Sequence, residues 1–151
     1  MSSETDGVQA RLRRLEDREQ IWQLLMDYRR HLDQRDFAAY AELFAEEGEW
    51  EGSLGHAKGP AAIEALLDEK LEVYPDDASR TYHLITNPTI EVNGDRATAE
   101  STWCFITRDE SDRAVVALLG HYRDVLTRED GGWKFLARRV FTDIPFRPTD
   151  S

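Results

Sequence analysis

The sequence predicts an α+β domain in which three N-terminal helices pack on a strongly curved antiparallel sheet, a cone-shaped barrel with an internal pocket. Apolar residues recur at spacings of three and four in the first half of the chain, which is typical of amphipathic helices. From Arg80 onward the pattern changes to alternation, with turn residues between the runs. The 151 residues suffice for one domain, which we expect at residues 8–147 with flexible tails at 1–7 and 148–151.

Three helices are predicted before the alternating region. The first runs from about Val8 to Leu32 because its apolar residues share one face. Asp36 is a candidate N-cap for a short second helix. Pro60 marks the first position of a third helix, which Pro75 closes. The apolar residues behind these predictions are Leu12, Leu15, Ile21, Leu24, Leu25, Tyr28 and Leu32, then Phe37, Tyr40, Ala41 and Phe44, then Ile63, Leu66, Leu67 and Leu71.

Strands form the rest of the domain. Asn93-Gly94 supplies the positive φ angles of a two-residue hairpin turn, and Pro88 suggests a bulge that bends the strand before it. Such long strands cover a compact core only if the sheet curls, which leaves a hollow between helices and sheet. We expect a short strand at 49–53 and four hairpin-linked strands at 82–92, 96–108, 114–127 and 133–143.

Charge and cysteine content narrow the classes of function. The formal net charge of −11 repels phosphate backbones and anionic lipid, so nucleic acid and membranes are not expected partners. Cys104, the only cysteine, excludes an internal disulfide, a thiolate zinc site and an iron–sulfur cluster held by this chain alone. The four histidines lack metal-ligand spacing, so we expect no metal. With no apolar signal or spanning segment in the sequence, a cytoplasmic location is the natural expectation.

Four short stretches carry a resemblance to a known family: Leu32-Asp33-Gln34-Arg35-Asp36-Phe37, Leu43-Phe44-Ala45-Glu46-Glu47-Gly48, Tyr82-His83-Leu84-Ile85-Thr86-Asn87-Pro88 and Asp130-Gly131-Gly132-Trp133-Lys134-Phe135. In this order they resemble the nuclear transport factor 2-like superfamily, and within it the SnoaL-like branch, over roughly residues 8–144. Relatives include scytalone dehydratase, bile-acid dehydratase and polyketide cyclases. The resemblance implies a cofactor-independent lyase or isomerase that acts on a hydrophobic, carbonyl-bearing molecule.

Three residues could carry that chemistry. Tyr28 lies on the apolar stripe of the first helix, so its hydroxyl needs an internal partner. Asp33 lies at the carboxyl end of that helix, where the macrodipole disfavours a negative charge and a cationic partner would hold it. The resemblance implies that His83 is a general base, that Asp33 pairs with it, and that Tyr28 donates to a substrate oxygen. The alternative is that none of them acts in catalysis: Tyr28 is then a core tyrosine, Asp33 a capping or solvated aspartate, and His83 a structural histidine.

The sequence departs from the family pattern at two positions. Thr107 falls where dehydratases carry a second histidine or an aspartate, and Gly52 falls where ketosteroid isomerases carry the carboxylate base. A second acid is therefore missing unless His121, Glu51 or Arg138 supplies it.

Aromatic residues are expected to line the pocket. His121 and Tyr122 are neighbours on one strand and face opposite sides, and we expect Tyr122 to point inward. A hollow lined by aromatic rings would suit a flat aromatic or polycyclic substrate. The predicted substrate-binding residues are Trp50, Trp103, Phe105, Tyr122 and Phe141.

Two further expectations concern partners. The last strand offers large apolar side chains to both faces, which predicts a homodimer or homotrimer. Gly120–Leu126 also resembles the small β subunits of ring-hydroxylating dioxygenases, so a non-catalytic subunit stays an alternative, as does a ligand-binding domain without turnover.

Overall fold

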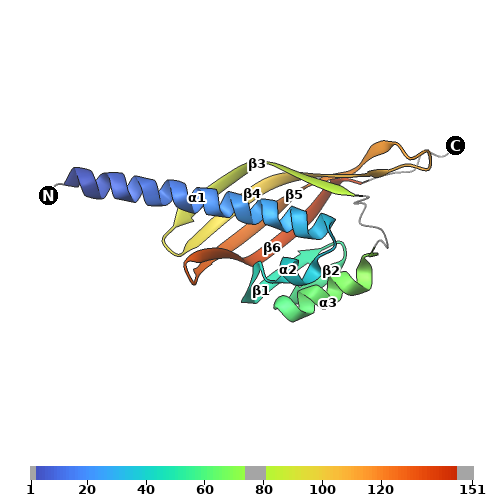
Figure 1. The fold of residues 1–151 in the computed structure, drawn as a ribbon, viewed down its shortest axis with the longest axis horizontal. Coiled ribbons are helices and arrows are strands. Elements are labelled where there is room, and N and C mark those ends of the chain that lie inside the picture. The colour runs from blue at the N-terminus through green and yellow to red at the C-terminus, as the bar shows by residue number, and fades with distance from the viewer. Residues whose placement is uncertain (1–2, 74–80, 146–151) are drawn as a thin grey trace.

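Helices lie across one face of a six-stranded sheet (Figure 1), in a computed structural model that describes residues 3–73 and 81–145. The elements are α1 (Ser3–Asp33), α2 (Phe37–Ala41), β1 (Phe44–Gly52), β2 (Gly55–Lys58), α3 (Pro60–Lys70), β3 (Tyr82–Asn93), β4 (Arg96–Arg108), β5 (Ala114–Glu129) and β6 (Gly132–Ile144). None of the helices in these ranges is long and apolar enough to cross a membrane.

The sheet has the strand order β2-β1-β6-β5-β4-β3 and is not closed into a full barrel. The α+β class with three helices against a curved sheet is confirmed, as are the hairpins that join β3 to β6. The expectation of a purely antiparallel sheet is wrong in one place, because β1 runs parallel to β6. No hairpin turn links these two strands, so nothing local fixes their relative direction.

The starts of α2 and α3 follow the local signals, whereas other boundaries differ from them. Asp36 caps α2 by accepting a hydrogen bond from the Ala39 amide at 3.1 Å, and Pro60 begins α3. Helix α1 starts at Ser3 rather than Val8. Strand β1 starts at Phe44, a residue expected in the second helix, rather than at Glu49, and strand β2 was not expected. Helix α3 ends at Lys70, and Pro75 lies outside the described residues.

A bulge bends β3 where proline predicted one. The pairing of β3 with β4 shifts register between Thr86 and Thr89, and Asn87 has a φ of 53°. The two-residue turn after β3 is Gly94-Asp95 rather than Asn93-Gly94: Gly94 takes a φ of 64°, whereas Asn93 does not take a positive φ and still pairs with Arg96. The bend and the twist of the long strands leave a concave face toward the helices, where Ile21, Leu25 and other α1 residues form the core with the sheet.

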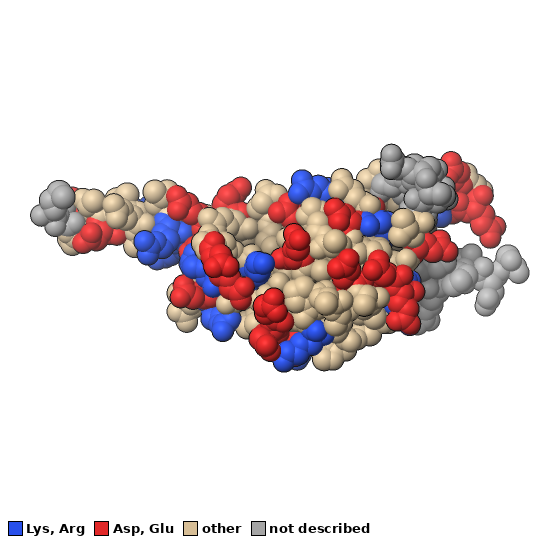
Figure 2. Space-filling model, turned by 60° about the horizontal axis from the view of Figure 1, so that its bottom comes forward, with Lys and Arg blue, Asp and Glu red and all other residues tan. Residues whose placement is uncertain are grey.

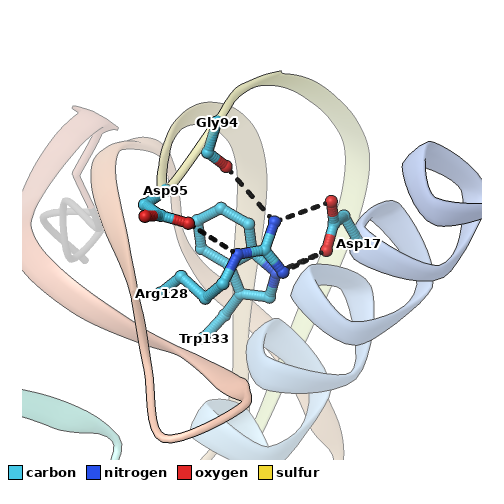
Figure 3. Close-up of polar contacts among 5 residues, drawn as sticks. All are labelled: Asp17, Gly94, Asp95, Arg128 and Trp133. Carbon is cyan, nitrogen blue, oxygen red and sulfur yellow. Dashed lines mark hydrogen bonds and ion pairs between the residues drawn. The ribbon is translucent and has the colours of Figure 1, made fainter. Parts of the chain in front are cut away.

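A polar clamp fixes the middle of α1 to the strand ends (Figure 3). The buried Asp17 carboxylate accepts two hydrogen bonds from Arg128, at 2.6 and 2.9 Å, and one from the Trp133 indole at 3.2 Å. Arg128 also donates to Asp95 and to the Gly94 carbonyl in the β3–β4 turn. The hydrogen bond from Arg128 is the main cause that lowers the pKa of Asp17. The clamp therefore sets the angle at which α1 crosses the sheet.

Candidate active site

A cavity of about 210 Å³ lies between the helices and the concave face of the sheet. Its walls come from all three helices, from β1, from β3 to β6 and from the β1–β2 turn, and most of the lining is apolar or aromatic. A larger open hollow of about 580 Å³ lies beside α1, but it is lined by charged residues such as Asp17 and Arg128 that already bind each other. The smaller, apolar cavity is therefore the better candidate for a ligand site.

His83 lies in the wall of this cavity, and the structure places Asp33 against it. Asp33 Oδ1 lies 2.6 Å from Nδ1 of His83, and Asp33 Oδ2 accepts from the His83 backbone amide at 2.8 Å. Arg29 lies 3.6 Å from the same carboxylate. Both side chains are well covered, with exposed fractions of 16% for His83 and 6% for Asp33. Two hydrogen bonds to one carboxylate fix the position of the imidazole as well as its orientation.

This contact also determines which imidazole nitrogen can act. A carboxylate only accepts hydrogen bonds, so it holds the proton of neutral His83 on Nδ1 and leaves the Nε2 lone pair available. Nε2 has no hydrogen-bond partner within residues 3–73 and 81–145. The ring lies 4.9 Å from Phe105 and 6.5 Å from Trp103, measured between centroids. In its neutral form, His83 therefore presents the Nε2 lone pair beside an apolar cavity.

Tyr28 lines the same cavity and is held by Trp50. The Trp50 indole nitrogen donates a hydrogen bond to the Tyr28 hydroxyl oxygen at 3.1 Å. Because an indole N–H can only donate, this bond leaves the hydroxyl proton of Tyr28 to be donated elsewhere. The Tyr28 ring also packs against Tyr40 at 4.6 Å and against the edge of Tyr122 at 5.7 Å. These contacts make Tyr28 a rigid donor rather than a mobile one.

A buried ion pair lies beneath these tyrosines. The Arg138 guanidinium lies 3.6 Å from the Tyr122 ring centroid and 3.9 Å from that of Tyr28, and its Nε is 3.2 Å from Asp124 Oδ1. Both charged side chains have no solvent exposure. Burial raises the pKa of Asp124 to about 6 although Arg138 opposes the shift, and burial also raises the pKa of Tyr122 well above its usual value. Arg138 is not part of the cavity lining, so it acts on the site through the aromatic rings above it.

Four of the five residues predicted to bind substrate line the cavity, namely Trp50, Trp103, Phe105 and Tyr122. The prediction for Phe141 is wrong. Its ring stacks on His121 on the outer face of the sheet, at 4.6 Å and 7°, because Val140 and Thr142 on either side of it point into the cavity.

The missing second acid is not supplied by any residue considered for it. His121 lies on the outer face, where its Nδ1 is 2.7 Å from Asp143 Oδ2. Glu51 faces Arg139 at 3.7 Å and is exposed, and Thr107 does not line the cavity. The site therefore offers an imidazole base at His83 and, among several hydroxyl groups, one at Tyr28 that Trp50 holds in place.

Several lining residues were not expected from the sequence. Tyr40 was placed only in the core of the second helix, and Ser53, Thr142 and Arg35 had no assigned role. Thr142 could have been found from strand alternation once the register of β6 was known. Ser53 and Arg35 lie in turns, where no periodic pattern indicates direction. Within the described parts of the chain, no group of three or more potential ligands is placed to hold a metal.

Comparison with known proteins gives a family and several structural relatives. The family model of the SnoaL-like domain matches residues 13–139. A search of curated proteins finds no match. An NTF2-like protein with a cystatin-like fold from Novosphingobium aromaticivorans is similar at 32% identity and a TM-score of 0.77, over 88% of this chain and 86% of that one.

Two other solved structures belong to enzymes or candidate enzymes. A candidate scytalone dehydratase from Novosphingobium aromaticivorans is 25% identical with a TM-score of 0.71, over 91% of this chain and 96% of that one. A hexachlorocyclohexane dehydrochlorinase is 24% identical with a TM-score of 0.74, over 93% and 99% of the two chains, and this likeness concerns the fold. The fold is thus shared with proteins named for elimination reactions.

Proposed function

Because the chain belongs to the SnoaL-like family, we propose that it is a cofactor-independent lyase or isomerase, of dehydratase, isomerase or cyclase type, for a small hydrophobic molecule with a carbonyl group. The observation that carries this proposal is the 2.6 Å contact between Asp33 and His83, whose imidazole lines an apolar cavity. A dehydratase-type relative and a dehydrochlorinase with the same fold support elimination or isomerisation as the kind of reaction.

In the proposed reaction, Nε2 of His83 removes a proton from the carbon next to the substrate carbonyl. Asp33 stabilises the imidazolium that forms, because the carboxylate is already bonded to Nδ1. Tyr28 donates its hydroxyl proton in a hydrogen bond to the enolate oxygen as negative charge develops there. The enolate then expels a leaving group, takes up a proton at another carbon or closes a ring. Each of these outcomes uses the same first step.

The cavity also limits the substrate. Its volume of about 210 Å³ is below the range of roughly 300–1,000 Å³ that is usual for drug-sized ligands. Trp50, Trp103 and Phe105 give it flat aromatic walls. We therefore propose a substrate with one or two rings rather than a larger polycyclic one.

Turnover of cyclic ketones and hydroxyketones of this size would test the proposal. Once a substrate is found, His83→Ala should lower kcat/KM by about 10²- to 10⁴-fold, the usual contribution of a general base. His121→Ala, which removes the histidine on the outer face, is the matched control and should turn over like the wild type. Full activity in His83→Ala would contradict the mechanism. Ligands that bind without any product would favour a binding domain without turnover.

The outer face of the sheet supports the predicted homodimer or homotrimer. Leu84, Cys104, Leu119 and Ile144 form one row across β3 to β6, and three of these side chains are exposed. An auxiliary dioxygenase subunit would use such a face for a larger partner, so the mass of the purified chain distinguishes the two uses. A cytoplasmic location stays a prediction.

A further inference from the structure

The N-terminal end of α1 projects beyond the sheet (Figure 1). Every residue from 3 to 16 is exposed, and coverage begins at the clamp residue Asp17. A helical segment of this length without packing is only marginally stable in water. Its apolar side chains would also remain in contact with solvent. Both features indicate that another surface covers this segment.

The exposed segment carries its own apolar stripe. Val8, Leu12 and Leu15 have exposed fractions of 60%, 53% and 64% and follow each other at spacings of four and three. This is the spacing of the a and d positions of a coiled coil. At 100° per residue, the stripe points away from Ile21 and Tyr28, which face the sheet. A partner helix could therefore lie on the stripe without displacing the sheet from α1.

We propose that the projecting ends of α1 from two copies of this chain pair in parallel through Val8, Leu12 and Leu15. The flanking charges favour this partner and this direction. In a parallel pair, Arg11 of one copy lies beside Glu16 of the other, so the two-fold symmetry forms two ion pairs. Neither Arg11 nor Glu16 has an ion-pair or hydrogen-bond partner within the ranges that the structure describes. An antiparallel pair would instead bring Arg11 toward Arg18 of the other copy.

The pairing stops at the body of the protein. Glu19 takes the next position of the stripe, so two Glu19 carboxylates would face each other if the helices stayed together. Each copy has a net charge of −11, and Figure 2 shows acidic side chains spread over the face in view. Repulsion between the facing Glu19 carboxylates therefore confines the helix pairing to the projecting ends. A contact of this size belongs to the small class of interfaces, and we expect dimers that dissociate on dilution.

Sedimentation velocity of the full chain over a range of concentrations tests the apolar contact. The double variant Leu12→Gln/Leu15→Gln should lose one concentration-dependent association step, with the dissociation constant raised at least about tenfold. Val73→Gln is the matched control, since Val73 is similarly exposed at 67% but lies away from the stripe, and it should keep that step. Circular dichroism melts of each variant check that the fold is retained.

Charge reversal tests the partner and the direction. Arg11→Glu and Glu16→Arg should each weaken the step, and the double variant Arg11→Glu/Glu16→Arg should restore it, because the pairs then re-form with opposite signs. The proposal is overturned if the association step survives Leu12→Gln/Leu15→Gln, if the double charge reversal fails to recover it, or if Leu84→Gln on the outer sheet face abolishes the same step.

Discussion

The two faces of the sheet each carry a histidine–aspartate pair. The pairs have similar contact distances but differ in burial and in their neighbours. Nδ1 lies 2.6 Å from the carboxylate in His83–Asp33 and 2.7 Å away in His121–Asp143. The first pair is covered, with exposed fractions of 16% and 6%, and adjoins the cavity. The second pair is open, at 30% and 51%, and its imidazole stacks flat on Phe141. A short contact alone therefore does not identify a functional site.

Surroundings decide what such a pair can do. Water screens a charge on the outer face, whereas the same charge interacts more strongly in the low-dielectric interior. His83 also has its backbone amide bonded to Asp33, so the pair has a second point of attachment that His121–Asp143 does not have in the described chain. Only the inner pair combines a fixed base, shielding from water and space for a substrate.

The largest difference between the two faces should appear in catalysis. Asp33→Asn keeps the shape of the side chain but removes the charge that fixes the Nδ1–H tautomer and stabilises imidazolium. We expect kcat to fall by about 10²- to 10⁴-fold, while Asp143→Asn on the outer face stays within about twofold of wild type. Steady-state kinetics of both variants measure this contrast. If Asp33→Asn and Asp143→Asn lowered kcat equally, the inner pair would have no special role in catalysis.

The next largest effect should appear in stability. Asp124→Ala leaves the fully buried Arg138 without its counter-charge, which typically costs about 3–5 kcal/mol of unfolding free energy. The exposed pair of Arg123 and Glu100, 3.4 Å apart on the outer face, gives the matched control, and Glu100→Gln should cause no measurable change. Urea denaturation at neutral pH measures both. A cost below about 1 kcal/mol for Asp124→Ala would show that the interior tolerates the unpaired guanidinium.

Most of the fold could be predicted from local signals. Asp36 and Pro60 mark helix starts, Pro88 marks a bulge and Gly94 marks a turn, one residue later than Asn93-Gly94 predicted, because each acts on the backbone within a few residues. The parallel pairing of β1 with β6 was not predictable in this way. It depends on contacts between strands at opposite ends of the sequence, and no local pattern fixes their direction.

The candidate site, too, was predictable only where local sequence patterns determine the position of a side chain. The positions of Asp33 and His83 came from a family resemblance, since the residues alone left structural roles open for both. Phe141 was misplaced because a strand with large side chains on both faces has no clear apolar side, so its direction depends on register. Arg138 was considered only as an acid, since charged residues are rarely fully buried unless they are paired. Its pairing with Asp124 follows from the β5–β6 register, which the sequence does not display.

The smallest effect concerns the clamp of Asp17 and Arg128. Its burial lies between that of the fully buried pair Asp124–Arg138 and that of the exposed pair Glu100–Arg123. Arg128 and Trp133 lower the pKa of Asp17 by hydrogen bonding to its ionised form. A carboxyl with a lowered folded-state pKa stabilises the protein above its ordinary value of 3.8, and this contribution disappears as the pH falls through the folded-state pKa. Asp17→Asn should therefore cost about 1–3 kcal/mol of unfolding free energy at pH 7.

That cost should shrink once the pH falls below 3.8, because the unfolded chain then binds a proton at Asp17 more readily than the folded protein does. The protonation of Asp124 has the opposite sign: because its pKa of about 6 lies above 3.8, proton binding there adds most stability below pH 4 and none well above pH 6, where the ionised carboxylate pairs with Arg138 instead. Urea denaturation of wild type and Asp17→Asn at pH 7 and near pH 3 measures the difference, with Asp95→Asn at the exposed edge of the clamp as control. A cost for Asp17→Asn that is the same at both pH values would mean that the clamp depends on its hydrogen-bond geometry and not on the charge of Asp17.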